Sequence, residues 1–428
     1  MTVALLFTAF LVLLMLSVPI GISLGAATAI TIITASDVNP ILLAQRIFAG
    51  LDSFTLLAIP FFMLAGNLMA HGGIARRIVA LCDVLVGRFT GGMSLVTVGA
   101  CMIFAAMSGS APATVTAIGA IMIPEMVKRK YEEGFSTALT ATAGTVGVIL
   151  PPSIPLVIYG VASGTSVGDL FIAGVIPGLL VGFVLMFVGL FISRKRGYKG
   201  ITLAPGEKMP SLRKTFLDAI PALLAPFIIL GGIYSGIFTP TEAAVIAIVY
   251  ALIVGVFWYK EITWKIWVEA LRTTADLTGL TGLALGFSMA FASFLAIEQI
   301  PNQVAEAMLA TVETDWLLIL MINFILLFVA LFVDNISSCL ILTPVLLPVA
   351  VACGMDPVHF GIMMTIALTI GFVTPPYGVN LFVASAVAKV RIEVIAKAAI
   401  PFVIAMFVCL MLVAYIEPIS MSLVRAIR

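Results

Sequence analysis

Long apolar runs separated by short polar stretches occupy the chain from its first residues to its last. An α-helix rises 1.5 Å per residue, so roughly 20 apolar residues cross the hydrocarbon core of a membrane. The pattern predicts about 11 transmembrane helices, near residues 3–35, 54–70, 92–107, 135–160, 168–192, 217–237, 241–259, 277–297, 316–333, 358–375 and 394–416. Two further apolar stretches, 108–127 and 336–352, are short and interrupted by Gly, Pro and Ser, so we expect arms of two re-entrant hairpins.

Composition narrows the class of protein. Of the 428 residues, 62% are hydrophobic and only 10% are charged, whereas soluble domains carry about 25% charged residues. The fold class is therefore an all-α polytopic membrane protein. A net charge of +1 excludes a nucleic-acid-binding protein that relies on bulk charge. No lysine follows a glycine, so the chain lacks a P-loop with which to use ATP.

The polar stretches predict how the chain is organised. Residues 193–214 hold seven basic residues against one glutamate, as expected of a cytoplasmic linker between two halves. Residues 40–53 are amphipathic and predict a helix in the membrane interface, with an ordinary connecting loop as the alternative. We expect scaffold helices at 1–88, a first transport-core repeat at 89–192, the linker at 193–216, more scaffold helices at 217–315, a second core repeat at 316–390 and a C-terminal helix at 391–428.

An internal repeat links the two halves. The segment TVGVILPPS at 145–153 matches TIGFVTPPY at 369–377, and Pro124 matches Pro348 with the same offset. The alternative is chance similarity between apolar segments, which an ungapped register disfavours. Three basic residues at 128–130 follow the first hairpin, but the matching segment 352–358 has none, so the copies should be inverted in the membrane. This organisation predicts an inverted-repeat secondary transporter.

The core has almost no side chains that could relay protons. Residues 89–124 and 134–168 contain no Asp, Glu, His, Lys or Arg, and Asp334 is the only acid between Asp315 and Asp356. Proton-coupled transporters generally carry such residues within the membrane. We therefore expect coupling to a cation that is bound by carbonyl and hydroxyl oxygens where helices break. Na⁺ is a hard ion that suits such oxygens, as Mg²⁺ and Ca²⁺ do. A membrane-embedded enzyme is disfavoured for the same reason.

Two clusters have the composition of such broken-helix ion sites. The first pairs a hairpin tip with a break and comprises Ser108, Gly109, Ser110, Gly144, Thr145, Gly147 and Pro151. The second comprises Asp334, Asn335, Ser337, Ser338, Thr369, Gly371 and Thr374. Close helix packing is the alternative role for any single small residue, and Asp334 could also be a helix N-cap.

We expect the substrate between these clusters, facing Ser153, Tyr377 and Asn380, with Thr114 and Thr343 as further polar candidates. The core holds no arginine or lysine, so an anionic substrate would depend on helix dipoles, hydroxyls and bound cations. Lys389 and Arg391 follow the second break and are better explained as anchors at the membrane interface.

Four segments resemble the large membrane subunit of tripartite ATP-independent periplasmic (TRAP) transporters: SGSAPATVTAIGAIMIPEM at 108–126, GVILPPSIPLVIYG at 147–160, AGVIPGLL at 173–180, and DPVHFGI with GFVTPPYGVNLFV within 356–383. The resemblance implies Na⁺-coupled uptake by an elevator mechanism across the bacterial inner membrane. It implies a small four-helix membrane subunit, expected here as a separate polypeptide, and a soluble periplasmic substrate-binding protein. It also implies an organic acid substrate such as sialic acid or a C4-dicarboxylate, and overall likeness favours sialic acid. Ion sites carried over from the family lie at Ser108–Ser110 with Gly144–Pro151, and at Val333–Asn335 with Gly371–Thr374.

One alternative function stays open at this point. A Na⁺-driven anion permease of related architecture would work without a binding protein. In either case we expect residues 89–192 and 316–390 to move as one body against scaffold helices near 54–70, 217–259 and 277–297.

Overall fold

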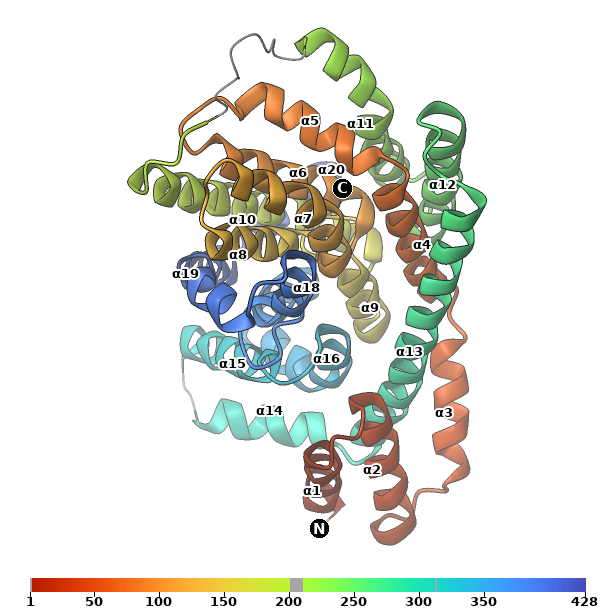
Figure 1. Cartoon of the computed structure of the whole chain (residues 1–428). Coiled ribbons are helices and arrows are strands. Elements are labelled where there is room, and N and C mark those ends of the chain that lie inside the picture. The colour runs from red at the N-terminus through yellow and green to blue at the C-terminus, as the bar shows by residue number, and fades with distance from the viewer. Residues whose placement is uncertain (1, 201–210, 312–313) are drawn as a thin grey trace.

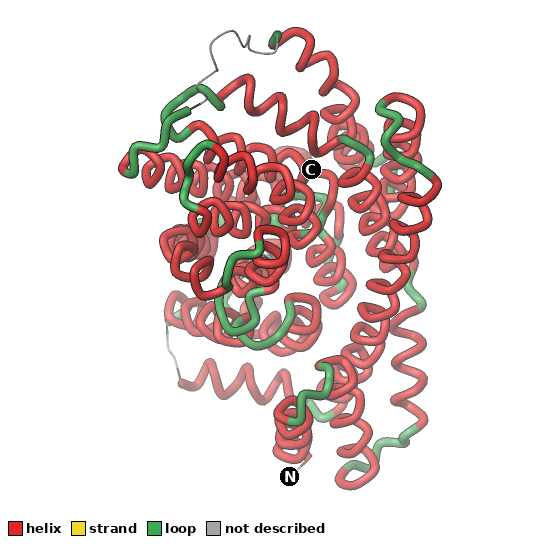
Figure 2. The backbone as a smooth tube through the Cα atoms, viewed as in Figure 1, coloured by secondary structure: helices red, strands yellow, loops and turns green. Residues whose placement is uncertain are grey.

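The computed structural model describes residues 2–200, 211–311 and 314–428, and in that part of the chain every regular element is a helix (Figure 1; Figure 2). Seven helical stretches among the described residues are long and apolar enough to cross a membrane: Phe54–His71, Val167–Lys195, Leu212–Tyr234, Pro240–Trp258, Trp264–Ile297, Asn335–Ala352 and Ile392–Tyr415. The predicted all-α membrane fold is confirmed. The number of crossings and the re-entrant nature of the hairpins stay predictions.

The first apolar run forms two helices, so the predicted single helix over 3–35 is wrong. Helices α1 (Thr2–Met15) and α2 (Ile20–Ala35) pack side by side, and the Thr2 hydroxyl donates to the Ala35 carbonyl at 3.1 Å. The chain reverses before Pro19. Proline has no N–H to donate to a carbonyl of the preceding helical turn, and it disfavours a helical conformation at the residue before it. A run of apolar residues long enough for one helix thus becomes a hairpin.

The helices of the second half repeat those of the first at the spacing of the sequence motifs. Helix α7 (Ala111–Lys128) corresponds end to end with α16 (Asn335–Ala352). The other corresponding pairs are α6 (Gly92–Ser108) with α15 (Asp315–Ala330), α8 (Glu133–Gly144) with α17 (Pro357–Ile370), α9 (Ile154–Ser163) with α18 (Val379–Ala388), and α10 (Val167–Lys195) with α19 (Ile392–Tyr415). The second repeat therefore continues through α19, beyond the predicted boundary at 390. The predicted C-terminal helix is instead α19 followed by α20 (Pro418–Ile427).

The two repeats pack reciprocally to form one core. Helix α7 packs against α18 while its counterpart α16 packs against α9 (Figure 1). Likewise, α8 packs against α19 and its counterpart α17 packs against α10. When each helix of one repeat contacts the same partner in the other repeat as its counterpart does, the two repeats are related by an approximate two-fold axis. The core is thus a pseudosymmetric body in which each hairpin covers the broken helix of the other repeat as well as its own.

The remaining helices flank this core. Helix α4 (Ala58–His71) packs against α12 (Pro240–Leu252), and α11 (Leu212–Tyr234) packs against α5 (Ile74–Val86). Helix α13 (Trp264–Ile297) contacts α2, α4 and the amphipathic α3 (Ile41–Leu51), which has no fully buried residue (Figure 1). At 34 residues, α13 is much longer than the predicted span 277–297. Helix α14 (Ile300–Thr311) leads to the second repeat.

The ends of the predicted basic linker are described and its middle is not. Helix α10 continues through Lys195 and α11 begins at Leu212, so helices enter the predicted linker from both sides. Residues 201–210 lie outside the described residues.

The α1–α2 hairpin predicts a specific cross-link. Cysteines introduced by Thr2→Cys and Ala35→Cys should join on oxidation or with a short thiol cross-linker, because the Thr2 side chain already contacts Ala35. In one continuous helix these residues would stand about 50 Å apart. SDS gel mobility of a variant whose native cysteines are replaced measures the product. The pair Met15→Cys with Ala35→Cys is the control, since these residues end the two helices at opposite ends of the hairpin.

Candidate binding site at the hairpin tips

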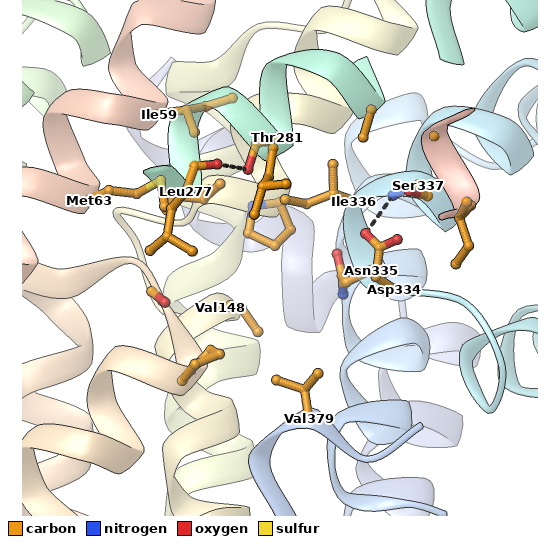
Figure 3. Close-up of a pocket in the computed structure, with 18 of the residues that line it drawn as sticks. Ile59, Met63, Val148, Leu277, Thr281, Asp334, Asn335, Ile336, Ser337 and Val379 are labelled. Carbon is orange, nitrogen blue, oxygen red and sulfur yellow. Dashed lines mark hydrogen bonds between the residues drawn. The ribbon is translucent and has the colours of Figure 1, made fainter. Parts of the chain in front are cut away.

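Both hairpin tips and both helix breaks border one cavity of about 530 Å³ (Figure 3), within the range of small-molecule sites. Core residues that line it are Gly109, Ser110, Pro112, Val148, Ile154, Pro155, Asp334, Asn335, Ile336, Ser337, Phe372, Tyr377 and Val379. The flanking helices supply the opposite wall, with Pro19, Ile20, Gly21, Ile22, Ile59, Met63, Leu277, Leu280, Thr281, Leu283 and Ala284. The cavity therefore lies between the core and the helices that flank it.

The first hairpin tip satisfies its own polar groups. Helix α6 ends at Ser108, and the φ of +62° at its C-cap Gly109 favours glycine. Ser110 caps α7 by accepting from the Ala113 N–H at 3.4 Å. The Thr114 hydroxyl donates to the Ser110 carbonyl at 2.8 Å and lies 2.9 Å from the Ser108 hydroxyl. The predicted residues of this tip thus form one small network.

The first helix break lies directly against this tip. After α8, a 3-10 turn (Thr145–Val148) leads to Pro151 and α9. A Cβ at Gly147 would stand 2.7 Å from the Thr114 hydroxyl and 2.8 Å from the Ser110 carbonyl, and one at Gly144 would overlap Val115. Only glycine permits this approach, so the first predicted cluster is brought together.

The second tip leaves buried polar atoms without partners. The Asp334 carboxylate caps α16 by accepting from the Ser337 N–H at 2.9 Å. Asn335 is 3% exposed, and neither atom of its amide has a hydrogen-bond partner. The buried Ser338 hydroxyl is also unpartnered. Buried polar groups are nearly always hydrogen-bonded, so these atoms mark a place suited to a ligand.

The second break also packs against its tip. The Tyr377 N–H donates to the Leu331 carbonyl at 3.1 Å, and a Cβ at Gly371 would overlap the carbonyl of Ala330. Thr374 follows the short 3-10 turn Gly371–Val373, and its hydroxyl donates to the Ile370 carbonyl at 2.8 Å. Val333 precedes Asp334, in the turn that ends α15. The second predicted cluster thus surrounds the tip of α15 and α16.

Of the five predicted substrate residues, Tyr377 lines the cavity, whereas Thr114, Ser153, Thr343 and Asn380 do not. Ser153 caps α9 by accepting from the Leu156 N–H at 3.4 Å, and Thr114 belongs to the first tip. The Thr343 hydroxyl lies 3.7 Å from the Cys339 sulfur and 3.6 Å from the Met364 sulfur. The Asn380 amide donates to the Ala141 carbonyl at 3.0 Å, which joins α18 to α8, and its amide oxygen is unpartnered.

The wall opposite the tips was absent from the sequence prediction. It is formed by aliphatic side chains of α4 and α13, such as Ile59, Met63 and Leu277. These residues resemble any other apolar residue of a membrane helix. Only the packing of distant helices around the tips reveals them.

Comparison with known proteins identifies close relatives. The family model described as "Tripartite ATP-independent periplasmic transporter, DctM component" matches residues 7–419. The chain is 44% identical to an isethionate TRAP transporter permease protein of Oleidesulfovibrio alaskensis, over 97% of this chain and 65% of that protein's length. It is 41% identical to a C4-dicarboxylate TRAP transporter large permease protein of Pseudomonas aeruginosa (94% and 93% covered) and 40% identical to a sialic acid large permease protein of Vibrio cholerae (96% of each). The relatives are permeases, not enzymes.

Solved structures share the fold at low sequence identity. The YdaH transporter of Alcanivorax borkumensis matches with a TM-score of 0.62 at 11% identity, over 87% of this chain and 86% of the other. The MtrF efflux pump of Neisseria gonorrhoeae matches with a TM-score of 0.60 at 12% identity, over 87% and 84%.

The contact between tip and break predicts an effect on stability. Gly109→Ala should destabilise the core, because a Cβ there would stand 2.9 Å from the Pro152 carbonyl at a positive φ. Gly164→Ala is the matched control, since Gly164 has a similar φ of +72° with open space around it. Both variants pay about 1 kcal/mol for the backbone conformation, and Gly109→Ala should lose roughly 1–3 kcal/mol more through crowding. Thermal unfolding in detergent measures the difference, and equal losses would contradict the proposed close packing.

Proposed function

The chain belongs to the DctM component family of tripartite ATP-independent periplasmic (TRAP) transporters, and we propose that it takes up an organic acid anion across the bacterial inner membrane by Na⁺ symport. The observation that carries this proposal is the convergence of two hairpin tips and two helix breaks on one cavity. Such broken helices direct dipoles and backbone oxygens at ions and anionic substrates.

The second tip supports the cation part of the proposal. Asp334 supplies a carboxylate next to the unpartnered amide of Asn335 and hydroxyl of Ser338. Oxygen atoms of this kind suit a hard cation such as Na⁺. Within the described part of the chain, no three His, Cys, Asp or Glu side chains gather to ligate a metal, so the proposed ligands are mainly neutral oxygens. A second Na⁺ is proposed at Ser108–Ser110 with Gly144–Pro151, where the first break meets its tip.

Helix N-termini support the anion part, and those of α7, α9 and α18 have no charged cap. Residues at the starts of α7, α9, α16 and α18 all line the cavity: Ser110 and Pro112, Ile154 and Pro155, Asn335 to Ser337, and Val379. The N-terminal end of a helix carries a partial positive charge and exposes N–H groups. The relatives are named for isethionate, C4-dicarboxylates and sialic acid, and we propose that the substrate of this chain comes from the same range of organic acid anions.

The proposed mechanism is an elevator. The core, α6 to α10 with α15 to α19, would move as one body past α2, α4, α11, α12 and α13. The reciprocal packing of its repeats supports rigidity, and the position of the cavity between both bodies supports exposure to one side at a time. We further propose two partners, a small membrane subunit and a periplasmic substrate-binding protein, in keeping with the tripartite family description.

The Na⁺ site predicts a change in ion dependence. Proteoliposomes containing this chain and its partners should take up substrate only with an inward Na⁺ gradient. Asp334→Asn keeps a capping oxygen but removes the charge, so the Na⁺ concentration for half-maximal uptake should rise about tenfold. Asp356→Asn is the matched control, because Asp356 caps α17 by accepting from the Val358 N–H at 2.7 Å and does not line the cavity.

Two results would change this proposal. Uptake that follows a pH gradient alone would refute Na⁺ coupling. Uptake that needs no binding protein would instead favour a partner-independent anion permease.

The elevator predicts that joining the two bodies stops transport. Gly66 of α4 contacts the first tip, and a Cβ at Gly66 would stand 3.4 Å from the Ser108 Cβ, near the spacing of a disulfide. Gly66→Cys with Ser108→Cys should form a disulfide that stops the uptake which the reduced double variant retains. The two single variants and the reduced double variant provide the baseline. Full uptake by the oxidised pair would refute movement between these bodies.

A further inference from the structure

One face of α13 changes from charged to apolar at the level of the cavity. A single row of exposed side chains follows this face at helical spacing: Lys265, Glu269, Arg272, Asp276, Leu280 and Leu283. Leu280 and Leu283 line the cavity, and Asp276 lies one turn before Leu280. The cavity wall therefore continues along α13 as a charged row, which comprises Lys265, Glu269, Arg272 and Asp276.

The charged row leads to the basic end of the molecule. Arg77 of α5 pairs with Glu261, just before α13 begins. The Tyr259 hydroxyl donates to the carbonyl of Asp218, near the start of α11, at 2.8 Å. Further basic residues lie close to these contacts in the sequence: Arg76, Arg213, Lys214, Lys260 and Lys265. Basic residues mark the cytoplasmic side of a membrane protein, so the row runs from that side to the cavity.

The cavity end of the row lies at membrane depth. The Asn67 amide donates to the Thr274 hydroxyl at 3.1 Å, and Asn67 is one turn from the end of the apolar stretch Phe54–His71. Asp276 lies two residues farther along α13, toward the cavity. A charged side chain at this depth nearly always faces water or an opposite charge. In the part of the chain that the structure describes, no ion pair involves the charged row. Its side chains therefore require water.

The signs of the charges alternate along the row. Positive Lys265 and Arg272 are interleaved with negative Glu269 and Asp276, so an ion of either sign meets no block of like charge. Arg272 is the basic residue of the row nearest the cavity. It lies eight residues from Leu280, a distance of about 12 Å along the helix axis.

We infer that the charged row lines a water-filled path by which the substrate leaves the cavity for the cytoplasm, and that Arg272 attracts the anion on this path. This place for a small organic anion is distinct from the hairpin tips. The inference rests on the proposed function, which supplies the anion and the direction of transport.

Thiol labelling from one side of the membrane tests the path. Inside-out vesicles hold the chain, with its native cysteines replaced, and its small membrane subunit. Leu280→Cys should react there with membrane-impermeant methanethiosulfonates that carry an ethylsulfonate or an ethyltrimethylammonium group. Phe227→Cys is the matched control and should not react, because Phe227 is 73% exposed against 69% for Leu280 but belongs to the apolar membrane helix α11. An unreactive Leu280→Cys, as expected if lipid or a partner helix covers the row, would overturn the inference. Equal reaction at Phe227→Cys would overturn it too.

Charge variants test the role of Arg272. In the Leu280→Cys background, Arg272→Gln should slow the sulfonate reagent about threefold and speed the ammonium reagent about as much, because one positive charge is lost at about 12 Å. Arg272→Lys keeps the charge and should keep both rates. Arg213→Gln, at an exposed arginine of α11 that does not line the cavity, is the matched control and should change neither rate.

Unchanged rates in Arg272→Gln would overturn the role of this arginine. If that variant does not fold, Asp276→Asn decides, because loss of the negative charge should speed the sulfonate reagent and slow the ammonium reagent. The same rates with and without Asp276 would then overturn the inference.

Uptake in proteoliposomes separates this inference from the proposed function. Na⁺-driven uptake, with Leu280→Cys labelled only in right-side-out vesicles, would refute the path and uphold symport. Labelling in inside-out vesicles, with uptake that does not depend on Na⁺, would refute the proposed function and uphold the path.

Discussion

The contact of each hairpin tip with the broken helix behind it is the interaction on which the rest of this structure depends. A helix that breaks inside a membrane exposes backbone polar groups, which the bilayer cannot satisfy. Here the tip covers the break: the Ile154 N–H donates to the Gly109 carbonyl at 3.2 Å, and the Tyr377 N–H donates to the Leu331 carbonyl at 3.1 Å. Gly147 and Gly371 allow the chain to approach closely enough. Without this cover, neither the cavity nor the four converging N-termini would exist.

Duplication of this unit explains both the symmetry of the core and its chemistry. The pairing of α7 with α18 recurs as that of α16 with α9, so each repeat supports the other. The backbone is therefore common to both copies, while side chains are free to diverge. The first tip is neutral and internally bonded, and the second carries Asp334 with the unpartnered Asn335. A symmetric frame thus holds two tips of different chemistry, as the proposed binding of a cation together with an anion requires.

The wall formed by the flanking helices is apolar, whereas the tips are polar. Its aliphatic side chains offer no strong polar partner, so the polar groups that could bind the proposed substrate belong mainly to the core. An apolar wall also places few hydrogen bonds between the core and the flanking helices. That arrangement supports the proposed movement of the core past the flanking helices, since hydrogen bonds across the boundary would have to break at each step.

The sequence alone determined the membrane class, the repeat and the residues of the tips and breaks. Hydropathy and the Gly and Pro motifs are local properties of the chain, so both can be recognised without knowledge of which helices pack together. It could not reveal that residues 3–35 form a hairpin or that α13 extends back to Trp264. Hydropathy does not show where a continuous apolar segment reverses direction. A helix can also extend beyond its apolar residues, because its backbone hydrogen bonds do not depend on side-chain polarity. The cavity wall and the unpartnered state of Asn335 were likewise decided by tertiary structure. Both depend on which distant helices pack together. The sequence does not distinguish an apolar side chain that faces a cavity from one that faces lipid or another helix.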